Sequence, residues 1–365
     1  MSTTATSAAA ELDTDGVLAQ AQAFFSDLAG RGARRLELAT AAPEPVGLTP
    51  KDVVLERGTL RLYHYRPLVD EVYRVPVLLV MATTNKSFVF DLAPGQSMIE
   101  FLLQRGFDVY TLDWAPPTQA ERHLSLEDYT QDFIPSCAQA IQTRSGEPEL
   151  SIIGYCMGGV LSLIYAATHR KGPLKNLACI TTPVDWHQLG LMNVWNDPEY
   201  FDVDQLVDTL GILPVEAVTR MFEMQRPAQK TAGEMRLWSQ LADPDFVRSF
   251  RAFERWGEET LPLAGEYVRE TTKALCWDNQ LYTGELQVSG RSADLAQIEV
   301  PVLSIVAQHD HLAPRKATEP LLRLVGSEDK QEVLLKGGHV SLIAGLNARR
   351  RMWPQLERWL AVRST

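Results

Sequence analysis

Residues 150–159 of the chain read Leu-Ser-Ile-Ile-Gly-Tyr-Cys-Met-Gly-Gly, an apolar run that ends in a glycine-rich turn around Cys156. Glycines on both sides of the cysteine predict a turn too tight for neighbouring side chains. Apolar residues continue from Val160 onward, so a helix is expected to begin directly after the turn. A strand, a tight turn and a helix together present the residue at the turn as a nucleophile at the end of a sheet. Cys156 is therefore the predicted covalent nucleophile.

The same turn predicts how negative charge would be stabilised. The helix after Cys156 points its N-terminus at the sulfur, which favours a thiolate and a developing oxyanion. The backbone N–H of Met157 is the expected first donor of an oxyanion hole. The second donor is expected from the loop at residues 82–84, which follows another apolar run, with Thr83 as the candidate. The alternative for Cys156 is a buried, inert structural cysteine.

Apolar runs of strand length alternate with helical patterns on both sides of this turn. The expected strands lie at residues 76–81, 107–112, 150–153, 177–182, 301–306 and 332–335. The expected helices between and after them lie at residues 98–104, 124–143, 158–169 and 319–325, with a final helix near the C-terminus. Such alternation indicates an α/β fold in which helices cover both faces of a mostly parallel sheet.

The alternation stops between residues 183 and 299, a segment rich in helix formers and aromatic residues. We therefore expect one α/β core, formed by residues 16–182 and 300–365, that is interrupted by a mostly helical cap at residues 183–299. Residues 1–15 are small and polar and are expected to form a disordered tail. Residues 16–29 have helical spacing and predict an amphipathic helix.

Two catalytic partners of the cysteine follow it in the chain. Asp310 comes just after the expected strand at residues 301–306, and His339 comes just after the expected strand at residues 332–335. The order of nucleophile, acid and histidine, each at the end of a strand, is that of the α/β-hydrolase fold. His339 is expected to take the proton of Cys156, and Asp310 is expected to orient the imidazole.

Two alternatives remain open around the predicted acid. Asp185 also follows an expected strand, so it is the alternative acid, or else it caps a helix. His309 and His311 flank Asp310, which makes a metal-binding cluster the second alternative. Neighbouring residues at the end of a strand point in different directions and no further ligands stand near them, so no metal is expected.

Composition excludes several classes of function. The formal net charge is −11 and no basic block is present, which argues against a nucleic-acid partner. The four cysteines form no CxxC pair, so neither a zinc site nor a disulfide framework is expected, and a reducing cytoplasmic compartment is the simpler interpretation. No signal peptide and no apolar run of about 18 residues is present, so no transmembrane segment is expected.

A cysteine in place of the usual serine indicates the type of reaction. A thiolate forms a thioester intermediate, which matches the energy of a thioester donor and reacts readily with alcohols. This chemistry favours acyl transfer from a thioester such as an acyl-CoA to a hydroxyl group. An aromatic cap over the site would exclude the water that competes with the alcohol.

Motifs spread over nearly the whole chain are similar to those of one known family. They are the segment at residues 154–159, Asn85, Asp91-Leu92, Gly106 to Trp114, Leu124 to Tyr129, Thr182 to Asp185, Trp256, Tyr267, Asn279 to Leu281, Gly290 to Ile298, Asp310 to Pro314 and Gly337 to Val340. On these residues the chain resembles the catalytic subunit of polyhydroxyalkanoate synthases, particularly the short class III type that has two kinds of subunit.

The resemblance implies polymerisation of (R)-3-hydroxyacyl-CoA, with 3-hydroxybutyryl-CoA as the expected monomer, into a polyester with release of CoA. It implies that Cys156 carries the growing chain and His339 activates it, while Asp310 supports His339 or deprotonates the incoming 3-hydroxyl. It also implies a homodimer, a second synthase subunit and a place on the surface of polyester granules. The CoA thioester would be a substrate, and no cofactor is expected.

Two features depart from the family. Met157 stands where a polar residue is common, and the residues after His339 are more apolar than expected. A cysteine-dependent hydrolase of the same fold is the alternative enzyme: a thioesterase, a polyester depolymerase, or a protein like the dienelactone hydrolases, which share the Gly-Tyr-Cys stretch. A non-catalytic granule-coating protein is the other alternative.

Overall fold

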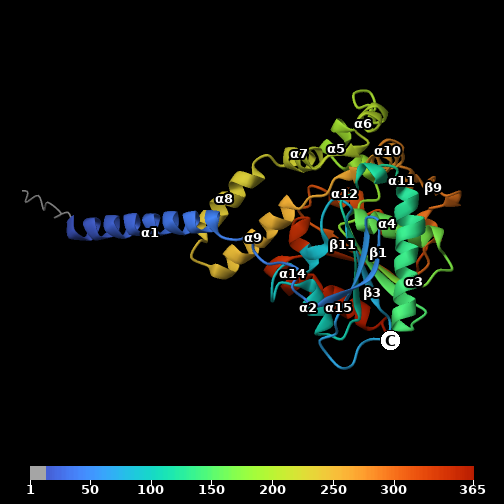
Figure 1. The fold of residues 1–365 in the computed structure, drawn as a ribbon, viewed down its shortest axis with the longest axis horizontal. Coiled ribbons are helices and arrows are strands. Elements are labelled where there is room, and N and C mark those ends of the chain that lie inside the picture. The colour runs from blue at the N-terminus through green and yellow to red at the C-terminus, as the bar shows by residue number, and fades with distance from the viewer. Residues whose placement is uncertain (1–13) are drawn as a thin grey trace, which may run out of the picture.

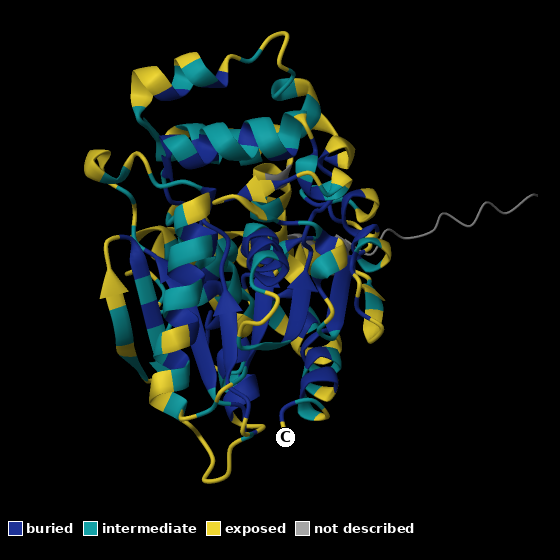
Figure 2. Cartoon of the chain, turned by 90° about the vertical axis from the view of Figure 1, so that its right-hand side faces the viewer, coloured by how far each residue is buried: buried dark blue, intermediate teal, exposed yellow. Residues whose placement is uncertain are grey.

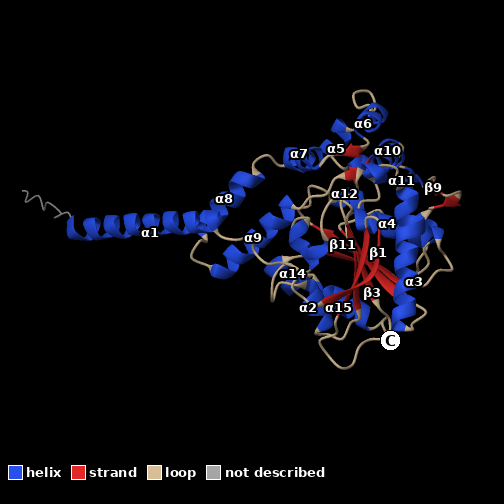
Figure 3. Ribbon diagram, in the orientation of Figure 1, coloured by secondary structure: helices blue, strands red, loops and turns tan. Residues whose placement is uncertain are grey.

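The computed structural model describes residues 14–365, and its centre is an eight-stranded sheet (Figures 1 and 3). The strand order is β1-β2-β4-β3-β5-β6-β11-β12. Strand β2 runs antiparallel to both of its neighbours, β1 and β4, and the six strands from β4 to β12 are parallel to one another. The bounds are β1 Lys51–Arg57, β2 Leu60–Tyr65, β3 Val77–Val80, β4 Val109–Trp114, β5 Leu150–Tyr155, β6 Leu174–Ile180, β11 Val302–Ala307 and β12 Lys330–Leu335. The prediction of a mostly parallel α/β sheet is confirmed.

Helices cover both faces of the sheet, which is why its central strands β3, β4, β5 and β11 are buried along their whole length (Figure 2). One apolar cluster packs α3 (Ile134–Ser145) and α4 (Met157–Thr168) against one face. The other cluster packs α2 (Met98–Leu103), α14 (Gly345–Arg351) and α15 (Trp353–Ala361) against the opposite face. Strands that are buried on both faces consist of continuous apolar residues, so these strands could be predicted from the sequence close to their observed positions.

The N-terminal helix is longer than predicted. Helix α1 covers Thr14–Thr40 and extends away from the body of the molecule (Figure 1). Residues 1–13 of the predicted tail lie outside the described residues, and the helix continues past residue 29 because Ala, Leu, Arg and Glu dominate its second half. Its C-terminal part contacts α8 (Gln229–Ser239) through Arg35, which forms an ion pair with Glu234 at 3.1 Å.

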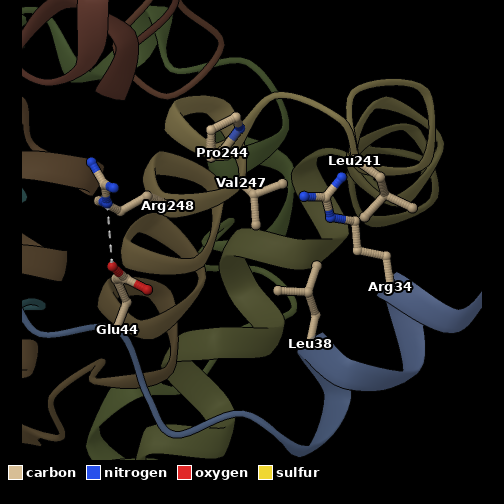
Figure 4. A pocket seen from close by; sticks show the side chains of 7 residues that line it. All are labelled: Arg34, Leu38, Glu44, Leu241, Pro244, Val247 and Arg248. Carbon is tan, nitrogen blue, oxygen red and sulfur yellow. Dashed lines mark ion pairs between the residues drawn. The ribbon is translucent and has the colours of Figure 1, made fainter. Parts of the chain in front are cut away.

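A hollow lies where this N-terminal region meets α9 (Pro244–Glu258) and the turn before it (Figure 4). Its lining residues are Arg34, Leu38, Glu44, Leu241, Pro244, Val247 and Arg248. An ion pair between Arg248 and Glu44 at 3.8 Å ties α9 to the segment after α1. None of the predicted site residues lines the hollow, so it is a feature of the junction between α1 and α9 and not of the candidate active site.

The segment between β6 and β11 is mostly helical. Its elements are η4 Trp186–Gln188, α5 Leu191–Trp195, α6 Val203–Leu210, β7 Ile212–Leu213, α7 Val215–Gln225, α8 Gln229–Ser239, α9 Pro244–Glu258, β8 Leu263–Ala264, α10 Gly265–Glu270, the π-helix η5 Thr271–Trp277, α11 Gln280–Thr283, β9 Gln287–Val288, β10 Arg291–Ser292 and η6 Leu295–Gln297. The two short antiparallel pairs, β7 with β8 and β9 with β10, were not predicted, because two-residue strands leave no periodic pattern.

Other elements differ from the predicted bounds for local reasons. The helix expected at residues 319–325 is shorter, α13 (Leu321–Leu324), and begins after Pro320; a separate helix that was not predicted, α12 (Arg315–Thr318), precedes it. The helix expected at residues 124–143 begins as a π-helix, η3 (Asp128–Phe133). Short 3₁₀ turns complete the chain as η1 Ser87–Phe90, η2 Gln119–Glu121 and η7 Val340–Leu342. Among residues 14–365, no helix combines the length and apolarity needed to span a membrane.

Candidate active site

Cys156 lies at a sharp turn between β5 and α4. Its backbone has φ 54° and ψ −122°, a conformation that is costly for any residue with a side chain. The turn is held on both sides: the Cys156 N–H donates to the Ile180 carbonyl at 3.0 Å, and the Cys156 carbonyl accepts from the Gly159 N–H at 2.9 Å. Such a strained turn projects the sulfur beyond the end of the sheet, as a nucleophile elbow does.

The glycines around Cys156 are required by close backbone approach. A Cβ added to Gly158 would overlap the carbonyl oxygen of Val80, and one added to Gly159 would overlap the side chain of Thr182. A Cβ on Gly154 would overlap the backbone of Gly159 itself. The sequence motif is therefore explained by three separate steric contacts. The contact with Val80 also places the end of β3, and the loop that follows it, beside the elbow.

The structure brings His339 and Asp310 together. His339 Nδ1 lies 2.7 Å from Asp310 Oδ2, and both side chains are buried. The second carboxylate oxygen of Asp310 accepts the backbone N–H groups of Leu312 and Ala313, each at 2.9 Å. The carboxylate is thus fixed by its own loop, and it in turn sets the tautomer of His339, since Nδ1–H donates to it and Nε2 is left for the cysteine.

The charge of His339 depends on its two neighbours. Burial by itself would lower the pKa of His339, but the negative charges of Cys156 and Asp310, with their hydrogen bonds, raise that pKa to about 10. Because the pKa is raised, the imidazolium persists from acidic pH through the neutral range and is lost only as the pH rises through about 10. A positive charge beside the sulfur favours the thiolate, which is the reactive form.

This electrostatic pairing predicts that His339 accelerates alkylation of Cys156. The imidazolium persists through the neutral range because the pKa of His339 is raised to about 10. A positive charge beside a sulfur favours its reaction as a nucleophile. We expect iodoacetamide at neutral pH to alkylate Cys156 on the order of 10-fold more slowly in His339→Gln than in the unchanged chain. Equal rates in the two chains would contradict the pairing.

The other candidates from the sequence lie elsewhere or are engaged otherwise. Asp185 is buried and accepts a hydrogen bond from the side chain of Asn279 at 2.9 Å, so its partner is Asn279 and not His339. His311 is half-buried and next to Asp310. Within residues 14–365 no three His, Cys, Asp or Glu side chains are grouped so as to hold a metal ion.

The remaining cysteines are not equivalent to Cys156. Cys137 and Cys179 are fully buried, and burial raises the pKa of each thiol, to about 12 in the case of Cys179. Cys276 is partly exposed as a residue, but burial of its thiol also raises the pKa to about 12. Thiols with raised pKa values stay protonated at neutral pH, so they are poor nucleophiles.

The two predicted oxyanion-hole residues lie at the elbow and at the loop beside it. Met157 is the first residue of α4, where backbone N–H groups have no partner within the helix. Thr83 is buried, and its hydroxyl donates to the hydroxyl of Tyr267 in the cap at 3.1 Å. No pattern in the sequence predicted this contact between residues far apart in the chain, although Tyr267 is one of the residues that resemble the family.

Comparisons with known proteins place the fold. Residues 76–346 match the family described as alpha/beta hydrolase fold, and residues 22–102 match the family described as poly-beta-hydroxybutyrate polymerase (PhaC) N-terminus. A soluble variant of monoglyceride lipase from Saccharomyces cerevisiae superposes with a TM-score of 0.58 at 15% identity, covering 88% of this chain and 97% of that one. A putative lipase from Sulfolobus solfataricus gives 0.55 at 14%, covering 86% and 99%. The predicted α/β-hydrolase fold is confirmed.

Curated relatives identify the family. A poly(3-hydroxyalkanoate) polymerase subunit PhaC from Allochromatium vinosum is 33% identical over 94% of this chain and 96% of its own length. The subunit of the same name from Haloferax mediterranei is also 33% identical, over 89% of this chain, which spans 66% of that longer relative. Both the identity and the coverage agree with the resemblance seen in the motifs. The chain belongs to the family of poly(3-hydroxyalkanoate) polymerase subunits PhaC, on an α/β-hydrolase fold.

Proposed function

We propose that the chain is the catalytic subunit of a polyhydroxyalkanoate synthase that polymerises (R)-3-hydroxyacyl-CoA, with 3-hydroxybutyryl-CoA as its monomer. The observation that carries this proposal is a cysteine at the elbow, next to a histidine whose ring is fixed by Asp310 at 2.7 Å. Relatives whose names describe polymerases of 3-hydroxyalkanoates support the choice of substrate.

In the first step the Cys156 thiolate attacks the carbonyl carbon of the CoA thioester. The negative charge that develops on the carbonyl oxygen is stabilised by the backbone N–H of Met157 and by a donor from the loop that contains Thr83. The C–S bond to CoA then breaks, CoA leaves as a thiol with the proton held by His339, and the acyl group remains on Cys156 as a thioester.

In the second step the 3-hydroxyl of another monomer attacks this thioester. His339 takes the hydroxyl proton, and Asp310 holds the ring and stabilises the imidazolium that forms. The new ester bond releases Cys156 as a thiolate and leaves an acyl-CoA longer by one unit. The longer acyl-CoA acylates Cys156 again with release of CoA, so a single cysteine suffices for elongation.

The product distinguishes this function from a cysteine-dependent hydrolase. With purified chain and 3-hydroxybutyryl-CoA, we expect release of CoA together with an insoluble polyester. Free 3-hydroxybutyrate with the same release of CoA would instead identify a thioesterase. No release of CoA at all, in the presence or absence of a second subunit, would favour a non-catalytic granule protein.

We also propose that the chain acts as a homodimer with a second synthase subunit at the surface of polyester granules in the cytoplasm. The relatives are named as subunits, which supports a multi-chain enzyme. Helix α1 exposes Leu18, Phe24 and Phe25, an apolar face that a partner would cover. Co-expression with a candidate partner should raise the rate of CoA release, and an unchanged rate would contradict dependence on it.

A further inference from the structure

The loop that follows β3 is bonded to the cap at four successive positions, residues 83–86. The hydroxyl of Thr83 donates to Tyr267, and the carbonyl of Thr84 accepts the backbone N–H of Leu261 at 2.7 Å. The side chain of Asn85 donates to Thr260 at 3.3 Å, and the two residues form an antiparallel bridge. All of these cap residues belong to one short segment, residues 256–267, which we call the strap.

A fourth hydrogen bond joins the loop to the strap at Lys86. Trp256, at the start of the strap, donates its indole N–H to the carbonyl of Lys86 at 2.8 Å. The ends of the loop are fixed instead by the core: Trp114 donates to the Met81 carbonyl at 3.0 Å, and Ser87 donates its backbone N–H to Asp113 at 2.8 Å. The part between these two anchors, which holds the expected second oxyanion-hole donor, is therefore held by the strap.

Burial raises the pKa of Tyr267, and the negative charge of Cys156 raises it further, so the bond between Thr83 and Tyr267 lies within electrostatic reach of the nucleophile. Both residues are buried, at 4% and 2% exposure, so water does not compete for this bond. The ring of Tyr267 packs against Tyr129, with the two centroids 4.8 Å apart. Tyr129 belongs to the π-helix η3, and Tyr267 belongs to α10, which continues directly into the π-helix η5. Irregular helices of this kind often accompany functional sites.

We propose that Tyr267 is a positioning residue. Through its hydrogen bond to Thr83, the strap holds the loop at residues 83–86 where the second oxyanion-hole donor is needed. Acylation of Cys156 then depends on the strap being packed against this loop. This inference rests on the proposed acyl-transfer function. Tyr267 acts through Thr83, and its effect falls on the acylation rate rather than on substrate binding. Any partner or product that moves the strap would then change the rate through this bond.

The test is a double-mutant cycle with Thr83→Val, Tyr267→Phe and both together. The rate of Cys156 acylation is measured in single turnovers with 3-hydroxybutyryl-CoA and, separately, with p-nitrophenyl acetate. Because displacement of a catalytic donor by a fraction of an ångström is costly, each single variant should lower the rate on the order of 10-fold with little change in the half-saturating concentration. The double variant should also lose about 10-fold rather than about 100-fold, because both changes remove the same bond.

Three controls separate positioning from damage to the fold. Thr83→Ser keeps the hydroxyl and should retain most of the rate. Tyr129→Phe removes a neighbouring buried hydroxyl and should leave the rate unchanged. Alkylation of Cys156 by iodoacetamide should be unchanged in Tyr267→Phe, because the nucleophile itself is intact.

The results that would overturn the role of Tyr267 differ from those that would overturn the proposed function. Unchanged acylation in both single variants, or losses that multiply in the double variant, would overturn the inference. If the ester acylates Cys156 but the CoA thioester does not, the proposed function fails, and the same cycle measured with the ester still decides the role of Tyr267.

Discussion

Replacing Cys156 with alanine is expected to lower CoA release from 3-hydroxybutyryl-CoA by at least about 10⁴-fold. The thioester intermediate cannot form without the sulfur, and the other three cysteines are thiols whose pKa values are raised by burial. Binding and the oxyanion donors would supply only the small residual rate. Titration of the released thiol measures the rate of CoA release, with 3-hydroxybutyryl-CoA as the only substrate.

Cys276→Ala is the matched control, because it removes a thiol of the cap without touching the elbow, and it should retain nearly full activity. Cys156→Ser tests the chemistry more finely. An oxygen nucleophile in the same place lacks the easy ionisation of a thiol, so the rate should stay far below that of the unchanged chain. Equal rates of CoA release in Cys156→Ala and the unchanged chain would contradict the mechanism.

A methyl group at Gly158 is expected to destabilise the fold by more than about 3 kcal/mol, or to prevent folding. The added Cβ would overlap the carbonyl oxygen of Val80, and neither the strand β3 nor the first turn of α4 can move away without loss of core packing. Urea unfolding of Gly158→Ala beside the unchanged chain measures the difference in free energy.

The control is Gly257→Ala near the end of α9, where an added Cβ meets nothing within 4 Å. Alanine is the better helix former, so this variant should be as stable as the unchanged chain or more stable by up to about 1 kcal/mol. If Gly158→Ala were as stable as Gly257→Ala, the elbow would not have the close approach to β3 that we describe.

The centre of the sheet could be predicted because its central strands are buried on both faces. Such strands are continuous apolar runs, and the order of Cys156, Asp310 and His339 along three of them already suggested which side chains would meet. The distance of 2.7 Å between His339 and Asp310 adds the orientation that no pattern contains. Asp185 shows the limit of this reasoning: it also follows a strand, but its partner is Asn279.

The segment at residues 183–299 could be recognised only as an interruption of the alternation between strands and helices. Its two-residue strands and its π-helix depend on packing against the core, so they leave no periodic signal in the sequence. The bond between Thr83 and Tyr267 joins residues 184 positions apart, and either side chain alone is an ordinary buried residue. Helix α1 was predicted too short because the apolar spacing ends before the helix-favouring composition does.

The central claim is that Cys156 carries the acyl chain, and the most direct test is peptide mass spectrometry of the chain quenched in acid during turnover of 3-hydroxybutyryl-CoA. We expect the peptide that contains Cys156 to carry one or more 3-hydroxybutyryl units, and hydroxylamine to remove them, as it does from a thioester. Turnover with Cys156 unmodified, or with the acyl units on another residue, would contradict the claim.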